Sequence, residues 1–101
     1  MMYNGMEFDT MQMIVINRGI EAGVDISKYI NPEFNFYQME VILQGLIDGV
    51  DVSSYADPRY DELQMEDILM GLKCNMDVST FANPNLKEED MFSAIQKQLL
   101  L

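Results

Sequence analysis

The chain has no histidine, no tryptophan, one cysteine and only 6 basic residues against 17 acidic ones. Without histidine, it lacks the side chain that most often acts as a general base near neutral pH. The single cysteine, Cys74, excludes an intramolecular disulfide and favours a reducing compartment. The net charge of -11 argues against direct binding to nucleic acid or to an anionic membrane, because both need a cationic face. A partner protein with a basic surface is the natural complement.

Long apolar runs are also missing. No segment approaches the ~18 consecutive apolar residues that a membrane span needs. The start of the chain, MMYNGMEFD, lacks the basic residue and the apolar run of a signal peptide. We therefore expect a cytoplasmic protein that does not enter a membrane, and the 101 residues suit a single domain.

One phrase occurs three times, at 23–32 (GVDISKYINP), 49–58 (GVDVSSYADP) and 75–84 (NMDVSTFANP), with successive copies 26 residues apart. The same shift brings a polar residue followed by methionine into register at 12–13, 38–39, 64–65 and 90–91. Spacing this strict, without gaps, predicts a tandem repeat.

Each repeat contains the signals of one long helix. Asp9, Asn35 and Asp61 are good N-caps, and each is followed three residues later by a glutamine, which is the pattern of a capping box. Apolar residues then recur at helical spacing and predict a helix of about 14 residues. The residues that end these helices, Gly23, Gly49 and Asn75, belong to the two types that best tolerate a left-handed backbone.

A short helical turn should follow each of the first three helices. Asp25, Asp51 and Asp77 are placed to cap it, and a proline then forces the chain to extend. We predict an all-α fold, a small α-solenoid of long-helix plus short-helical-turn repeats with about three and a half units. The expected segments are a lead-in at 1–8 and one repeat domain at 9–101, with units 9–34, 35–60, 61–86 and 87–101.

The fourth unit departs from this pattern. Lys87 stands where the other units have a capping residue, and Lys97 stands where they have a glycine. Gly19, Gly45 and Gly71 are therefore predicted to let the following short turn approach closely, since the last helix has no such turn.

The sequence indicates no catalytic residue, no metal ligand and no cofactor. The recurring Asp-x-Ser has oxygen atoms that suit calcium, but its spacing is not that of an EF-hand, and capping accounts for both residues. Met13, Met39, Met65 and Met91 are predicted to lie in the core because they share one repeat position. Met11, Met70 and Met76 are candidates for an exposed apolar patch, and 99–101 for covering the open end of the stack or for self-association.

The candidate partner-binding residues are carboxylates that vary between repeats: Glu40, Asp48, Glu62, Glu66, Asp67, Glu88 and Glu89. They fall outside the apolar stripe and are expected at the surface. Glu40 and Glu66 are equivalent, so they should lie on neighbouring helices ~8–10 Å apart and form part of a carboxylate row. Such a row offers a basic groove a substitute for phosphates, but a merely solubilising role is an open alternative.

The repeat phrase and the paired Gln-Met resemble short tandem repeats encoded by phages and mobile elements of Firmicutes. The resemblance covers the chain from Asp9 onward and implies a helical array without catalytic residues. By size and charge alone, the chain is also similar to inhibitors of host defence such as anti-CRISPR and anti-restriction proteins. That similarity implies a basic nuclease as the partner and the host bacterial cytoplasm as the location; a self-associating adaptor is the alternative.

Overall fold

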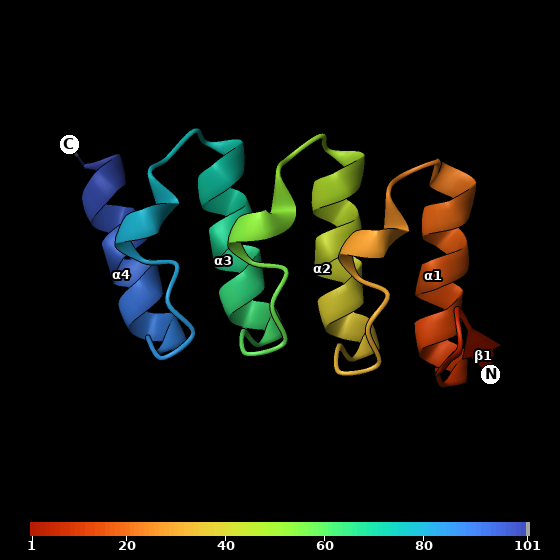
Figure 1. Ribbon diagram of the computed structural model, residues 1–101. Helices are drawn as coiled ribbons and strands as arrows, with labels where there is room; N and C mark the ends of the chain where they lie inside the picture. Colours follow the sequence, from red (N-terminus) through yellow and green to blue (C-terminus); the bar gives the residue numbers. More distant parts are fainter. Residues whose placement is uncertain (101) are drawn as a thin grey trace.

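The computed structural model describes residues 1–100, so Leu101 lies outside the described residues. Most of the chain is helical, as expected, and four helices lie side by side in chain order (Figure 1). They are α1 (Thr10–Ala22), α2 (Phe36–Ile47), α3 (Glu62–Lys73) and α4 (Glu88–Leu99). Each of the first three is followed by a 3-10 turn: η1 (Ile26–Lys28), η2 (Val52–Ser54) and η3 (Val78–Thr80).

The segment before α1 forms a small hairpin, which the all-α prediction did not include. Strands β1 (Met2–Tyr3) and β2 (Met6–Glu7) pair antiparallel, with Met2 opposite Glu7. Asn4 and Gly5 connect them with φ angles of 51° and 76°, the left-handed geometry of tight hairpin turns. The sequence signal for this hairpin is therefore the Asn4-Gly5 pair within the lead-in.

The starts and ends of the helices follow the local chemistry. The capping box is complete at Asp9, Asn35 and Asp61, whereas Lys87 makes no capping hydrogen bond through its side chain. The chain leaves the first three helices through residues with positive φ angles, at Gly23 (73°), Gly49 (75°) and Asn75 (57°). These exits limit the helices to 12 or 13 residues, slightly shorter than the expected length.

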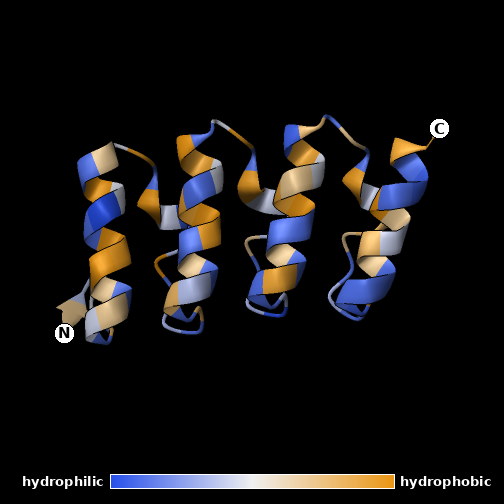
Figure 2. Ribbon diagram, turned by 180° about the vertical axis from the view of Figure 1, so that it is seen from behind, coloured by the Kyte–Doolittle hydropathy of each residue, from blue (hydrophilic) through white to orange (hydrophobic). Residues whose placement is uncertain are grey.

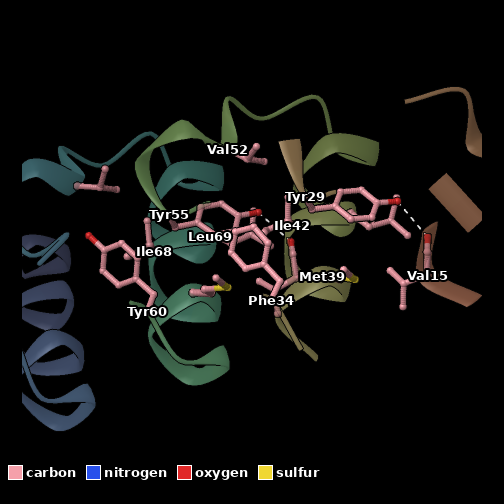
Figure 3. Packing of buried hydrophobic residues seen from close by; sticks show 14 of the residues in the cluster. Val15, Tyr29, Phe34, Met39, Ile42, Val52, Tyr55, Tyr60, Ile68 and Leu69 are labelled. Carbon is pink, nitrogen blue, oxygen red and sulfur yellow. Dashed lines mark hydrogen bonds between the residues drawn. The ribbon is translucent and has the colours of Figure 1, made fainter. Parts of the chain in front are cut away.

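The core repeats along the chain in the same way. Met39, Met65 and Met91 are fully buried as predicted, but Met13 in the first unit is only partly buried. An aromatic residue from each short turn fills the space beside its long helix, and Figure 3 shows Tyr29 and Tyr55 in this role. Their hydroxyl groups donate to the backbone carbonyl oxygens of Val15 (3.0 Å) and Val41 (2.8 Å). In the third unit Phe81 occupies this position, so the bond is lost.

Three glutamines connect each unit to the next. Gln38 Oε1 accepts from the backbone N–H of Asn35 at 2.8 Å, which closes the capping box of α2. Gln38 Nε2 donates to the carbonyl oxygens of Pro58 (3.2 Å) and Tyr60 (2.6 Å), which lie just before α3. Gln12 and Gln64 make the same bonds to the units that follow them. One buried amide therefore fixes both the start of its own helix and the approach to the next.

The recurrent glycine admits the short turn, as the sequence predicted. A Cβ atom on Gly45 would lie 2.8 Å from Cγ1 of Val52, and it would overlap the hydroxyl of Tyr55. A Cβ atom on Gly71 would lie 2.9 Å from Cζ of Phe81. Because real Cβ atoms do not approach other atoms this closely, each turn packs against its own helix only where there is no side chain.

Gly45→Ala should destabilise the protein by about 1–2 kcal/mol, even though alanine favours helix by about 1 kcal/mol. The added methyl group displaces Tyr55 and weakens its bond to Val41. Lys97→Ala, at the equivalent but exposed position of α4, should leave stability within about 0.5 kcal/mol. Urea unfolding followed by circular dichroism measures both, and a stabilised Gly45→Ala variant would contradict the close approach.

Gln38→Glu should cost about 2 kcal/mol at neutral pH, because a carboxylate cannot donate to the carbonyl groups of Pro58 and Tyr60. Gln96→Glu, an exposed glutamine on α4, adds the same charge and should have little effect. The comparison uses the same unfolding measurement. Equal effects of the two variants would mean that charge, and not the lost donor, causes the change.

Candidate functional site

The long helices share an exposed face that differs from unit to unit. We call it the outer face and define it by Met11, Ile14 and Arg18 of α1, Tyr37, Glu40 and Gln44 of α2, Leu63, Glu66 and Met70 of α3, and Glu89, Phe92 and Gln96 of α4. Figure 2 shows hydrophobic and hydrophilic stretches alternating along these helices. Since core positions repeat and these do not, the outer face is where units acquire different chemistry.

A groove between α2 and α3 opens on this face. It has a volume of about 250 Å³ and is lined by Arg18, Tyr37, Glu40, Val41, Gln44, Glu62, Glu66 and Leu69. Glu40 and Glu66 therefore line one groove from neighbouring helices, in line with the expected row. The row is interrupted, because Arg18 Nη1 bonds to Glu40 Oε1 at 2.9 Å. Glu62 and Glu66 make no ion pair among the described residues.

Asp48 lies away from this groove, at the end of α2. Lys73 Nζ is 3.1 Å from its carboxylate, and Gln44 also donates to it. The hydrogen bonds from Gln44 and Lys73 hold the pKa of Asp48 below its ordinary value. The structure thus separates Asp48 from the other carboxylates and partly neutralises it.

Asp67 is the main correction to the sequence interpretation, which placed it among surface charges. Its side chain is only partly exposed, and its Oδ2 atom is buried without a hydrogen-bond partner. Burial first, and then the neighbouring carboxyl groups of Glu88, Glu66 and Asp61, raise the pKa of Asp67 to about 7. The Asp67 and Glu88 carboxyl groups therefore lie close to one another between α3 and α4.

The side chains that lie between neighbouring helices become more acidic along the chain. Asp67 is equivalent to Val15 and Val41, which are buried, and Glu88 is equivalent to Phe36 and Glu62. The same pair of positions therefore changes from Val15 with Phe36, through Val41 with Glu62, to Asp67 with Glu88. The surface becomes increasingly acidic from α1 to α4. Sequence alone could have suggested this gradient by comparing equivalent positions, but not that they face one another.

Glu88 and Glu89 begin α4 together with Asp90, and no side chain caps that helix. Carboxylates in a first turn stabilise a helix by interacting with its dipole, so part of this charge has a local structural role. Glu89 is exposed, whereas Glu88 is partly buried beside Asp67. Of this pair, only Glu88 lies beside Asp67.

The recurrent aspartates act as caps. Asp25, Asp51 and Asp77 each accept a hydrogen bond at 3.1 Å from the backbone N–H of the serine two residues later. Bonds from the serine side chain and backbone lower the pKa of each of these aspartates. Within residues 1–100, no three side chains of the histidine, cysteine, aspartate or glutamate types gather closely enough to hold a metal ion.

The candidate apolar contacts divide into exposed and covered residues. Met11 and Met70 are 45% and 39% exposed, but Met76 packs partly buried against the core and does not belong to a patch with them. Leu99 and Leu100 are 63% and 87% exposed, so among the described residues they do not cover the end of the stack. The prediction for Leu101 falls outside the described residues.

No protein-family model, curated protein or solved structure matches this chain. In the part of the chain that the structure describes, no helix combines the length and the apolar character required to cross a lipid bilayer.

Asp67→Val should raise stability above neutral pH by about 1–2 kcal/mol, because it removes a buried group without a partner. The folded-state pKa of about 7 exceeds the unfolded value of ~3.9, so the folded form holds the proton more tightly. Stability should therefore fall as pH rises from about 4 to 7, and Asp67→Val should flatten this fall.

The reverse change provides the control. Val41→Asp puts a carboxyl group at the equivalent position of α2, where the groove also contains Glu62. It should lower stability and steepen the pH dependence. Denaturant unfolding at a series of pH values measures both variants, and an unchanged slope in Asp67→Val would disprove this assignment.

Proposed function

We propose that this chain is a non-enzymatic α-solenoid repeat protein that binds a basic surface on another protein. In its most concrete form it is a phage or mobile-element inhibitor of the anti-CRISPR or anti-restriction type, which blocks the nucleic-acid channel of a host defence nuclease in the bacterial cytoplasm. The observation that carries the proposal is the increase in acidity between neighbouring helices toward α4, where Asp67 and Glu88 take the places of Val41 and Glu62. The partner would supply lysine and arginine side chains to Glu62, Glu66, Asp67 and Glu88.

The cost of Asp67 supports this proposal. Valine occupies its place in two equivalent units and is buried there without any unpaired polar atom. Replacing it with a carboxyl group beside Glu88 works against folding, since like charges and burial both disfavour ionisation. A cation from a partner would reverse both effects, because it supplies opposite charge and hydrogen-bond donors. Groups that cost stability in the free protein often serve binding or activity.

The geometry also suits a nucleic-acid channel. Channels that hold nucleic acid carry lysine and arginine spaced to meet successive phosphates. Carboxylates on successive parallel helices recur every ~8–10 Å, which gives an extended protein surface of negative charge. Attraction between such surfaces speeds association and weakens with salt.

A self-associating adaptor is the second candidate, and exposed Phe92, Leu99 and Leu100 favour it. Other residues of the same unit argue against self-association. Where the preceding units have glutamine and glycine to receive a successor, α4 has Asp90 and Lys97, which are both exposed. Exposed charged residues at these two positions do not favour the docking of a further apolar helix. Repulsion between copies with a net charge of -11 also opposes association.

The test is inhibition of a guide-RNA-loaded Cas9-type nuclease and binding to it at several salt concentrations. Binding should weaken steeply with salt and should compete with target DNA. The double variant Glu62→Gln with Glu66→Gln should bind about tenfold more weakly, while Glu21→Gln with Glu33→Gln, which removes equal charge elsewhere, should stay within about twofold. Salt-insensitive binding, or equal losses in both double variants, would reject nucleic-acid mimicry at this groove.

A further inference from the structure

The geometry points to a specific occupant of the outer face: an amphipathic basic α-helix of the partner, lying across α1, α2 and α3. Its apolar side chains would pack on Met11, Tyr37 and Leu63. Its lysine and arginine residues would pair with the carboxylates beside that row and at its end, which are Glu40, Glu62, Glu66 and Glu89. This inference rests on the proposed function, because it specifies the partner surface that the proposed protein binds.

The first support is a row of exposed apolar side chains. Met11, Tyr37 and Leu63 occupy the same repeat position on three successive helices, and they are 45%, 50% and 55% exposed. Each long helix packs against the next in chain order, so equivalent positions on α1, α2 and α3 follow one another across the neighbouring helices. Exposed apolar residues scattered singly need no explanation, but a row of them on one face indicates a contact surface.

The second support is the charge beside the row. Glu62 and Tyr37 line the same groove between α2 and α3, together with Glu40 and Glu66. In α4 the row position itself is acidic, since Glu89 replaces the apolar residue of the other units. An apolar row with carboxylates beside it and at its end complements a helix with an apolar stripe flanked by basic residues. The acidic end also defines the orientation, with the more basic end of the partner helix pointing toward α4.

The spacing suits a helix laid across the stack. Neighbouring packed helices are ~8–10 Å apart, so α1 and α3 are separated by ~16–20 Å. Residues i and i+7 of an α-helix lie on the same face and advance ~10.5 Å along its axis. A partner helix of about 18 residues is ~27 Å long and can place an apolar residue over each helix in the row.

A second copy of this chain is a poor occupant of the same face. Each copy carries a net charge of -11, and docking two acidic faces together places like charges side by side. A basic helix removes that repulsion and also pairs with Glu62 and Glu66. The apolar row and the negative charge therefore both favour an amphipathic basic helix as the partner.

The experiment uses the full chain and three designed peptides of about 18 residues. The first has leucine at i, i+3, i+4 and i+7 spacing with lysine on its other positions; the second keeps the leucines but has glutamate for lysine; the third has the first composition in scrambled order. Fluorescence anisotropy measures the affinity of each labelled peptide. Only the first peptide should bind, and its circular dichroism should become helical on binding.

Tyr37→Ser and Leu63→Ser should each weaken binding of the first peptide about tenfold. Ile47→Ser provides the matched control, because Ile47 is 52% exposed and lies on the same helix as Tyr37 but ten residues further along, outside the row. It should change affinity less than about twofold, and circular dichroism verifies that all three variants fold.

Several results would overturn the inference: no binding of the first peptide, equal binding of the scrambled peptide, or equal effects of Tyr37→Ser and Ile47→Ser. Concentration-dependent dimerisation that Tyr37→Ser abolishes would assign the face to a second copy. Failure here leaves the nuclease test intact, since that test changes only Glu62 and Glu66. A nuclease bound with full salt dependence by Tyr37→Ser would keep the proposed function and reject the helical partner.

Discussion

The buried glutamine at the start of each of the first three helices is the interaction on which the architecture depends. Its oxygen atom accepts from the N-cap of its own helix, and its nitrogen atom donates to two carbonyl groups that precede the next helix. A buried amide left with unpaired donors and acceptors is costly, so neither bond forms well without the other. Local helix initiation and the attachment of the next unit are therefore coupled through one side chain. In α4 the equivalent residue is Asp90, which has no donor to offer a further unit.

Close packing of the short turn completes each unit. The aromatic residue of the turn reaches the long helix only because a glycine leaves room for its ring. Burial raises the pKa of Tyr29 to about 12, so its hydroxyl stays protonated and keeps its bond to Val15. The third unit has Phe81 instead, and Asp67 lies at the position whose carbonyl group would have accepted that bond. The third unit therefore lacks one bond between its short turn and its own helix, and the junction between α3 and α4 carries the acidic pair Asp67 and Glu88.

The exposed positions of the long helices can vary in side-chain type more than the buried core positions can. Each buried position must satisfy contacts with its own turn and with the next unit, whereas exposed positions on the long helices meet few such demands. Apolar residues consequently appear in a row on α1, α2 and α3, and carboxylates accumulate toward α4 without changing the packing of the helices. In this way four similarly packed helices present a surface whose acidity increases toward α4. That gradient, more than any single residue, is what the proposed functions use.

The sequence alone specifies the repeat period, the helix starts and ends, the capping aspartates and the role of the glycines, because each shows as a pattern of residue types within one 26-residue unit. The hairpin at Asn4 and Gly5 was also locally encoded, although the all-α interpretation omitted it. The tertiary structure decided which carboxylates meet. Arg18 pairs with Glu40, Lys73 pairs with Asp48, and Asp67 is buried against Glu88, although the sequence marks all four acids alike as variable charges. Those outcomes depend on which side chains face each other across neighbouring helices, and burial there changes the cost of a charge in a way that no single unit reveals.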